Sequence, residues 1–404
     1  MVNILLIQDT DWIVRGPHQQ HHIFERLGSK GDTVHVIDFD ILWNKKTSKN
    51  LFQKGFSIQP IPKTVKQSRV TVHRPPLVRI PLLDKLTIPL FHSIYINNTI
   101  RKHGIQIIVG QTILNSFCGL IFARIYGIPF IFHCIDSISS ISEDYIPKPF
   151  HFVAKLLEMA ICKYSDMNIA INKALRNYLI TRGAKPEKTI FLPTGVDFQK
   201  FQDASNRLKT REELGISNSD LVLFFMGWLY TFSGLKELAD YLVDNSIPDL
   251  KLLIVGDGDL YPYLSKLAST TTKIVTTGRI SFDNIPALLS AADICVLPSQ
   301  SNQITAHIVP IKLYEYMAAG KPVIASNLPG LMQEFGKTNG ILYCSDIEEL
   351  VKIANQLREN HEIEAVGEKG RQCMASNDWS LISIKYRTVL LQLLKSKRYN
   401  KDEN

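Results

Sequence analysis

Short apolar runs with the character of buried β-strands recur along the first half of the chain. They occupy residues 2–7, 34–38, 105–109, 130–134 and 167–171. Segments of helix length separate these runs, and the first helix is expected around residues 21–27. Because continuous apolar strands that alternate with helices are typical of a parallel sheet covered on both faces, this half predicts a Rossmann-like doubly wound domain.

The same alternation begins again in the second half of the chain. Apolar runs at residues 221–226, 250–255, 273–276, 294–297 and 322–325 predict a second parallel sheet. Pro193 and Gly195 interrupt the pattern between the two series, so we expect domains at residues 1–192 and 193–377. A final helix, 378–404, is expected to pack back on the first domain. The predicted fold class is α/β, with two doubly wound domains facing a central cleft.

Length and composition are consistent with two such domains. The chain has 404 residues, of which 45% are hydrophobic and 21% are charged. This balance is ordinary for globular proteins, and the length exceeds what one hydrophobic core usually organises. The six cysteines are scattered through mostly apolar runs, with neither a Cys-x-x-Cys pair nor a zinc-like spacing. This cysteine usage favours a reducing compartment.

No targeting segment or membrane span is expected. The N-terminal apolar run reaches Asp9 and no basic segment precedes it, so it has the pattern of a strand and not of a signal peptide. Asn115, Arg124 and the turn at Pro129 interrupt the most apolar long stretch, residues 113–135. We therefore expect a cytoplasmic protein.

The positive charge of the chain is concentrated in one segment. Residues 43–102, called here the basic band, hold twelve Lys and Arg residues and one acid, Asp84. Such a band attracts anions, which could be nucleic acid, anionic lipid or a phosphate-bearing acceptor; a solvated loop face is the simpler interpretation. Because the band lacks regular aromatic interleaving, nucleic acid is the least supported partner.

One block of sequence carries a candidate ligand-binding carboxylate. Pro310 suits a first helical position and Gly320 suits a helix end, which predicts a short helix between them. Glu315 falls in the second turn of this helix, among residues suited to burial. A buried carboxylate needs partners, and the vicinal hydroxyls of a ribose could supply them. The alternative is a structural pairing with a nearby base or backbone group.

Five motifs stand in one characteristic order. They are Pro193–Asp197, Gly256–Gly258, Thr277–Ile280, Ala291–Pro298 and Pro310–Ala325. In this order and spacing the chain resembles the retaining family-4 glycosyltransferases, over most of residues 190–330 and, more loosely, over both domains. The resemblance implies the GT-B fold and a nucleotide-sugar donor bound mainly to the C-terminal domain. It also implies that no metal and no other cofactor is needed.

The resemblance assigns roles to particular residues. Glu315 matches the family's ribose-binding glutamate, and Asp136 matches the Asp of a His-Asp pair that acts at the reacting sugar. Gly16 lies in the first loop, which usually carries glycines beside the donor phosphates. Further donor-binding positions are Gly227, Gly256, Gly258 and Leu313.

The chain departs from the family pattern at the usual phosphate cations and acids. Trp228 and Ser233 stand where the family has Arg and Lys. Lys312, Arg279 and Arg15 are candidates to replace those cations.

Two histidines are the remaining candidates. His307 replaces the first Glu of the family's Glu-x7-Glu motif, and Ile135 replaces the His of the His-Asp pair, with His133 two residues earlier on the same strand face. A histidine at 307 can donate a hydrogen bond and carry positive charge. We therefore count His133 and His307 with Asp136 as catalytic candidates.

These inferences predict a retaining glycosyltransferase. It would move a hexose-type sugar from a nucleotide-diphosphate donor to a glycan or lipid-linked acceptor, in the synthesis of cell-surface polysaccharide or glycoconjugates. The basic band would dock it as a peripheral protein at the inner face of the cell membrane. A non-catalytic, sugar-nucleotide-binding partner subunit is the alternative, because both usual cations are lost. A dehydrogenase is disfavoured by the incomplete glycine fingerprint.

Overall fold

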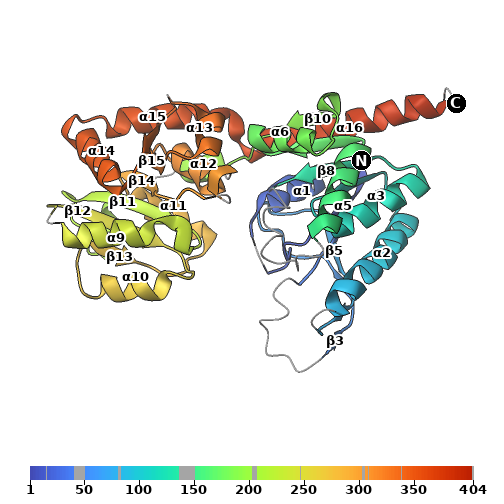
Figure 1. The fold of residues 1–404 in the computed structure, drawn as a ribbon, viewed down its shortest axis with the longest axis horizontal. Coiled ribbons are helices and arrows are strands. Elements are labelled where there is room, and N and C mark those ends of the chain that lie inside the picture. Colours follow the sequence, from blue (N-terminus) through green and yellow to red (C-terminus); the bar gives the residue numbers. More distant parts are fainter. Residues whose placement is uncertain are drawn as a thin grey trace. The chain divides into compact units, whose positions relative to one another are not determined.

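The structure is a computed structural model in which the chain forms two compact units (Figure 1). The N-terminal unit comprises residues 1–194 and 379–404, and the C-terminal unit comprises residues 195–378. The residues that the structure describes are 1–14, 16–40, 51–80, 83–135, 151–202, 207–245, 247–302, 305–307, 309–337 and 339–402.

An eight-stranded sheet forms the centre of the N-terminal unit. In spatial order its strands are β10 (Thr189–Phe191), β9 (Met167–Ala170), β8 (Phe130–Cys134), β7 (Ile107–Gly110), β1 (Asn3–Ile7), β2 (Thr33–Ile37), β5 (Val70–Arg74) and β4 (Phe56–Ile58). Neighbouring strands are parallel except for β4, which is antiparallel to β5. A separate antiparallel pair joins β3 (Phe52–Gln53) to β6 (Leu77–Val78).

Helices cover both faces of this sheet. They are α1 (Gln19–Ser29), α2 (Leu83–His103), α3 (Leu114–Tyr126), α5 (His151–Tyr164), α6 (Lys173–Thr181) and α16 (Trp379–Asp402). Successive strand residues point to opposite faces: Ile4 and Leu6 pack with α1 and α16, whereas Leu5 and Ile7 pack with α2, α3, α5 and α6. Burial on both faces explains why β1 is a continuous apolar run.

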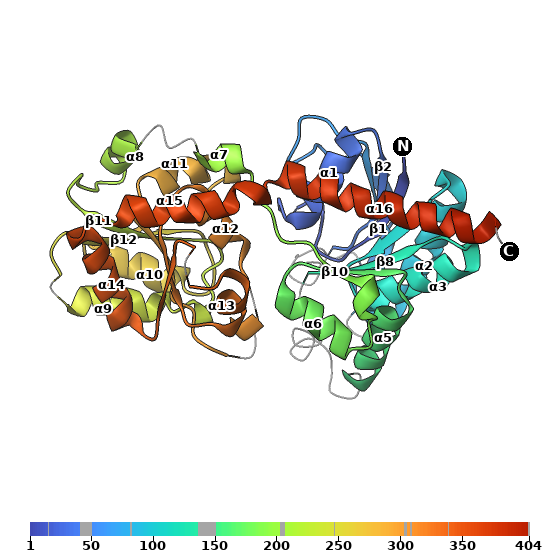
Figure 2. The same cartoon turned by 90° about the horizontal axis from the view of Figure 1, so that it is seen from above.

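The last helix of the chain, α16, completes the core of the N-terminal unit. It lies along α1 (Figure 2). Trp379 stacks on His22 with ring centroids 4.7 Å apart, and Tyr386 meets Phe24 edge-on at 5.5 Å. Farther along α16, the guanidinium of Arg387 pairs with the buried carboxylate of Asp32, just before β2. Residues from the two ends of the chain therefore share one core.

The C-terminal unit has a six-stranded parallel sheet. Its strands, in spatial order, are β13 (Ile274–Thr276), β12 (Leu250–Val255), β11 (Leu221–Met226), β14 (Ile294–Leu297), β15 (Val323–Ser326) and β16 (Ile341–Cys344). Its α-helices are α7 (Phe198–Gln202), α8 (Arg207–Glu213), α9 (Leu235–Asp244), α10 (Tyr261–Ala268), α11 (Ile285–Ser290), α12 (Ile311–Ala318), α13 (Pro329–Phe335), α14 (Ile347–Glu359) and α15 (Ile363–Met374). The predicted fold class, two Rossmann-like doubly wound domains, is confirmed.

A buried arginine ties α8 to this sheet. The Arg211 side chain has no exposed surface and pairs with Asp293 at 2.7 Å. Its guanidinium also donates to the backbone carbonyls of Ala291 at 2.9 Å and Ser217 at 2.9 Å. On the same helix, Lys209 and Glu213 form an exposed pair at 3.8 Å.

These two pairs predict different effects on stability. Arg211→Ala leaves several buried acceptors without a donor, so the free energy of unfolding should fall by about 3 kcal/mol. Lys209→Ala, the matched control on α8, should cost less than about 1 kcal/mol because water screens the exposed pair. Denaturant unfolding of both variants measures the difference. Equal losses would contradict the structural role of Arg211.

Candidate functional site

The centre of the C-terminal sheet is its topological switch point. β11 and β14 are neighbours, but the chain continues from β11 to β12 on one side and from β14 to β15 on the other. The loops that leave these two strands therefore diverge at their carboxyl ends. In open α/β sheets, ligands bind at this point.

Lys312 and Gly227 meet at this switch point. The Lys312 Nζ lies 3.8 Å from the centroid of the Phe225 ring, near the end of β11. A Cβ placed on Gly227 would come within 2.9 Å of the same Nζ. The ammonium group of α12 therefore lies against the backbone that leaves β11, where a phosphate group could meet both the charge and backbone amides.

Glu315 lies one helical turn farther along α12 and is buried, with 9% of its surface exposed. Burial raises the pKa of this carboxyl from 4.5 to about 7, and the charges of Lys312 and Lys200 oppose the change. Burial lowers the pKa of Lys312 from 10.5 to about 7, and Glu315 opposes that change. Both groups are poised to change charge near neutral pH, which is common for functional residues.

Two further residues of α12 fix the helix in place. Leu313, a predicted donor-binding position, has no exposed side-chain surface and belongs to the core. The hydroxyl of Tyr316 accepts a hydrogen bond of 2.8 Å from the backbone N–H of Met226, and its ring meets Phe224 edge-on. Tyr316 was not predicted; only the packing of α12 on β11 reveals its role.

The glycines of the neighbouring loops are required by close backbone packing. Gly256 has a φ of +138°, and a Cβ there would lie 1.9 Å from the carbonyl oxygen of Gly227. Gly258 has a φ of +151°, and a Cβ there would lie 2.6 Å from the backbone nitrogen of Leu229. The loops after β11 and β12 thus lie directly against each other. This contact accounts for both glycines whether or not they also bind a ligand.

Trp228 and Ser233, which stand where the family has Arg and Lys, carry no positive charge. Ser233 is buried, and its hydroxyl is among the side-chain atoms of the described residues that have no hydrogen-bond partner. Trp228 is half exposed, and the ring of Tyr230 near it stacks on Phe232 with centroids 4.8 Å apart. A buried hydroxyl and an aromatic surface therefore stand in place of two positive charges.

Contacts of Arg279 and His307 with this site are not established by the structure. Arg279 follows β13, the edge strand two positions away from β11, and its side chain is exposed. His307 ends the short helical turn η6 (Thr305–His307) before α12, and its side chain is not described. Arg15 lies outside the described residues. Of the three cations considered, the structure thus brings Lys312 to the switch point.

The N-terminal sheet has its own switch point between β1 and β7. Gly16, in the loop after β1, has a φ of +102°, and a Cβ there would lie 2.7 Å from the His21 ring. Asp9, which was not among the predicted site residues, lies two residues after the end of β1. Burial raises its pKa to about 6, opposed by a hydrogen bond from Asn115. A carboxyl with a raised pKa at this edge is a candidate for contact with a second substrate.

The other two catalytic candidates belong to β8 and the segment after it. His133 has no exposed surface, and its ring nitrogens lie 3.2 Å from the side-chain nitrogens of Gln19 and Gln111. Burial lowers its pKa to about 3, so the ring is neutral. Asp136 lies outside the described residues. The catalytic roles of both stay predictions.

A doubly wound sheet with a partly buried lysine and a buried carboxylate at its switch point suits a nucleotide ligand. Two such sheets in one chain also occur in the GT-B class of glycosyltransferase folds. The comparison with known families agrees: residues 21–200 match the description "Glycosyltransferase Family 4" and residues 220–360 match "Glycosyl transferases group 1". The chain belongs to this family of glycosyltransferases.

Individual relatives are distant. The chain is 28% identical, over 57% of its length and 60% of the relative, to the UDP-Gal:alpha-D-GlcNAc-diphosphoundecaprenol alpha-1,3-galactosyltransferase of Escherichia coli. It is 23% identical to an uncharacterized glycosyltransferase of Methanocaldococcus jannaschii, over 82% of this chain and 86% of the relative. Its fold resembles sucrose-phosphate synthase from Thermosynechococcus elongatus, with a TM-score of 0.75, 18% identity and coverage of 98% and 100%.

The raised pKa of Glu315 predicts how stability depends on pH without ligand. Because the folded state favours the protonated carboxyl, this contribution is complete below pH 4.5 and is lost as pH rises through about 7. Glu315→Gln keeps the neutral shape, so it should unfold at a higher temperature than the wild type at pH 8 and at a similar one at pH 5. The expected gain is about 1–3 kcal/mol.

Thermal melts at the two pH values, with exposed Glu212→Gln as control, measure this difference. Parallel pH profiles for wild type and Glu315→Gln would show that the carboxyl does not titrate as described.

Proposed function

We propose that the protein is a retaining glycosyltransferase that moves a hexose-type sugar from a nucleotide-diphosphate donor to a glycan or lipid-linked acceptor. The observation that carries this proposal is the placement of Lys312 and Glu315 on the first turns of α12, at the switch point of the C-terminal sheet. The Escherichia coli relative is named for a UDP-linked galactose and a diphosphoundecaprenol-linked acceptor. We place this reaction in the synthesis of cell-surface polysaccharide or glycoconjugates.

Lys312 and Glu315 suit the two polar parts of such a donor. A diphosphate beside Lys312 favours the ammonium form, which burial alone disfavours. Ribose hydroxyls donating to Glu315 favour the carboxylate in the same way. Donor binding therefore supplies the hydrogen bonds and opposite charge that these buried groups need, and no metal is required in this proposal.

The reaction itself requires stabilisation of charge on both sides of the broken bond. The departing diphosphate gains negative charge, which Lys312 and backbone amides near Gly227 would stabilise. The hydroxyl of Ser233 is a further donor that a phosphate oxygen could accept from. We assign Asp136 to the reacting sugar, as the family resemblance implies, and keep His133 and His307 as the other catalytic candidates. Asp136→Asn should then lower kcat more than donor affinity.

A binding experiment tests the donor site. Calorimetry with UDP, GDP and ADP identifies the nucleotide, and the matching nucleoside serves as its uncharged counterpart. Lys312→Met should weaken the diphosphate roughly 10- to 100-fold, because a charged hydrogen bond contributes about 1.5–3 kcal/mol, and should leave nucleoside binding nearly unchanged. Lys266→Met, an exposed lysine on α10, is the control.

Equal weakening of diphosphate and nucleoside would remove Lys312 from the phosphate site. Tight donor binding without any transfer to lipid-linked or glycan acceptors would favour the non-catalytic partner subunit instead.

We further propose that the basic band docks the protein on anionic membrane. Apolar side chains are exposed inside the band, with 51% of Phe52, 39% of Phe56 and 88% of Ile61 accessible. Lysines accompany them, including exposed Lys66. Exposed apolar side chains among bases suit a surface of acidic headgroups. Within the described ranges, no helix combines the length and apolar character needed to cross a membrane.

Liposome co-sedimentation tests this membrane surface. Binding should require anionic lipid and decrease at high salt, since each base near the surface contributes roughly 1 kcal/mol through a screened attraction. Phe56→Ser combined with Ile61→Ser should reduce binding, whereas Ile125→Ser, exposed on α3, should not. Binding that is equal on neutral vesicles would contradict the proposal.

A further inference from the structure

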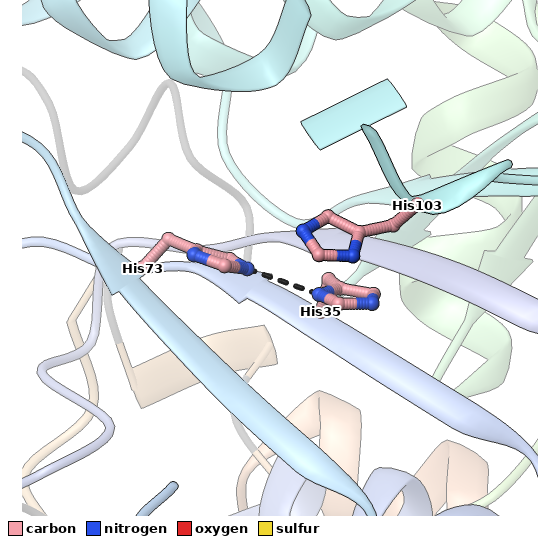
Figure 3. Close-up of side chains that lie close together, drawn as sticks. All are labelled: His35, His73 and His103. Carbon is pink, nitrogen blue, oxygen red and sulfur yellow. Dashed lines mark hydrogen bonds between the residues drawn. The ribbon is translucent and has the colours of Figure 1, made fainter. Parts of the chain in front are cut away.

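Three histidines from separate parts of the N-terminal unit lie close together (Figure 3). His35 lies on β2, His73 lies on β5, and His103 is the last residue of α2. Each ring offers one nitrogen, and these three atoms lie within 4.8 Å of one another. The shortest separation, between His35 Nδ1 and His73 Nε2, is 3.0 Å.

Regular secondary structure brings these rings together. In the parallel pairing of β2 with β5, His73 is opposite Ile37, so His73 and His35 lie on the same face of the sheet two residues apart in register. α2 packs on that face and ends at His103, whose carbonyl accepts a 3.1 Å hydrogen bond from the Asn3 side chain at the start of β1. Two strands and a packed helix end hold the ligand atoms, as a metal site requires.

The three rings are in the form that binds metal ions. Burial, together with the neighbouring histidines, lowers the pKa of His35 and of His73 to about 4. Burial and the positive charge of Lys102 lower the pKa of His103 as well. At neutral pH the imidazoles are therefore uncharged. Each ring then has one nitrogen with a free electron pair, as metal binding requires.

A fourth side chain orients one of the rings. The Ser57 hydroxyl, on β4, lies 2.8 Å from His73 Nδ1. When His73 Nδ1–H donates to this hydroxyl, His73 Nε2 accepts a hydrogen bond from His35 Nδ1–H in the metal-free protein. Metal binding then requires the His35 proton to move to the other ring nitrogen, which leaves both facing nitrogens with a free electron pair. Histidines that ligate metals are usually oriented by such a hydrogen bond at the other nitrogen.

The geometry points to a site for a divalent transition metal, and we propose that His35, His73 and His103 bind Zn²⁺ through their ring nitrogens. In a tetrahedral zinc site, with bonds of about 2.0–2.1 Å, neighbouring ligand nitrogens are roughly 3.4 Å apart. The observed 3.0 Å is close to this, and the third nitrogen lies within 4.8 Å of the other two. Because the His103 ring stacks on His35 with centroids 4.1 Å apart, metal binding in this proposal requires the His103 ring to turn toward the ion. The partly exposed His103 leaves the outer side open for water as a fourth ligand.

The chemistry of the ligands excludes most other cations. Three imidazoles without a carboxylate suit zinc and other late first-row ions, whereas calcium and magnesium prefer oxygen ligands. Bound zinc would tie the end of α2 to β2 and β5. The site is separate from the proposed contacts of the donor with Lys312 and Glu315, which belong to the C-terminal unit.

Metal titration of the full-length, chelator-treated protein tests the site without any nucleotide. Exposed Cys373 is first replaced by Ser, so that its thiolate cannot bind the added metal. Calorimetry should find one Zn²⁺ per chain, and Co²⁺ should give the visible d–d absorption of a four-coordinate nitrogen site. The melting temperature should rise with metal concentration.

Three variants assign the binding to the cluster. His103→Ala should fold, because this ring is partly exposed, and should weaken Zn²⁺ binding at least 10-fold. Ser57→Ala, which removes the orienting hydroxyl, should weaken it about 10-fold. The control His361→Asn removes an exposed histidine of the C-terminal unit and should bind as the wild type does.

Absence of Zn²⁺ uptake, or uptake that His103→Ala does not reduce, would overturn the proposal. If His103→Ala proves unstable, the Co²⁺ spectrum of the intact protein still decides: bands of an octahedral water-ligated ion would exclude the site.

Discussion

The C-terminal site depends on the desolvation of two ionisable groups on one short helix. Lys312 and Glu315 both lose hydration in the fold, and each partly offsets the cost of the other. The hydrogen bond from Met226 to Tyr316 and the packing of Leu313 hold α12 in this position. The rest of the site follows from this helix, because its first two turns determine where a ligand can meet both groups.

The loops around α12 use the absence of side chains to approach one another. A Cβ on Gly234 would lie 1.8 Å from the Pro298 carbonyl oxygen, just as one on Gly256 would collide with Gly227. Three loops, after β11, β12 and β14, are consequently packed backbone against backbone. Such packing makes the loop positions depend on glycine at each contact.

In the N-terminal unit, charged side chains hold the loops in place. The guanidinium of Arg74, at the end of β5, pairs with Asp11 at 2.6 Å and also with Asp38, so it ties the loop after β1 to the ends of β2 and β5. Asp38 accepts a further hydrogen bond from the backbone of Trp12. The loop that carries Gly16 is thereby held by buried ion pairs. The C-terminal end of α2 meets the sheet at the three histidines.

The sequence by itself determined the strands whose two faces are both buried, because these need unbroken apolar runs. The runs at residues 221–226, 250–255 and 294–297 coincide with β11, β12 and β14. β5 was missed, because His73 and Arg74 interrupt its apolar pattern. Both side chains have their partners on other segments of the chain. β16, of which only the two ends are fully buried, was missed as well.

Motif order also determined the family, and it identified Glu315 and Lys312 as candidates. Only the tertiary structure decided that Lys312, and not Arg279, lies against Gly227, because strand order in the sheet sets which loops are neighbours. It likewise decided that His133 is fully buried and that three histidines far apart in the chain meet. Local sequence specifies which faces must be buried, whereas contacts between distant segments depend on the register and order of strands, which no single segment encodes.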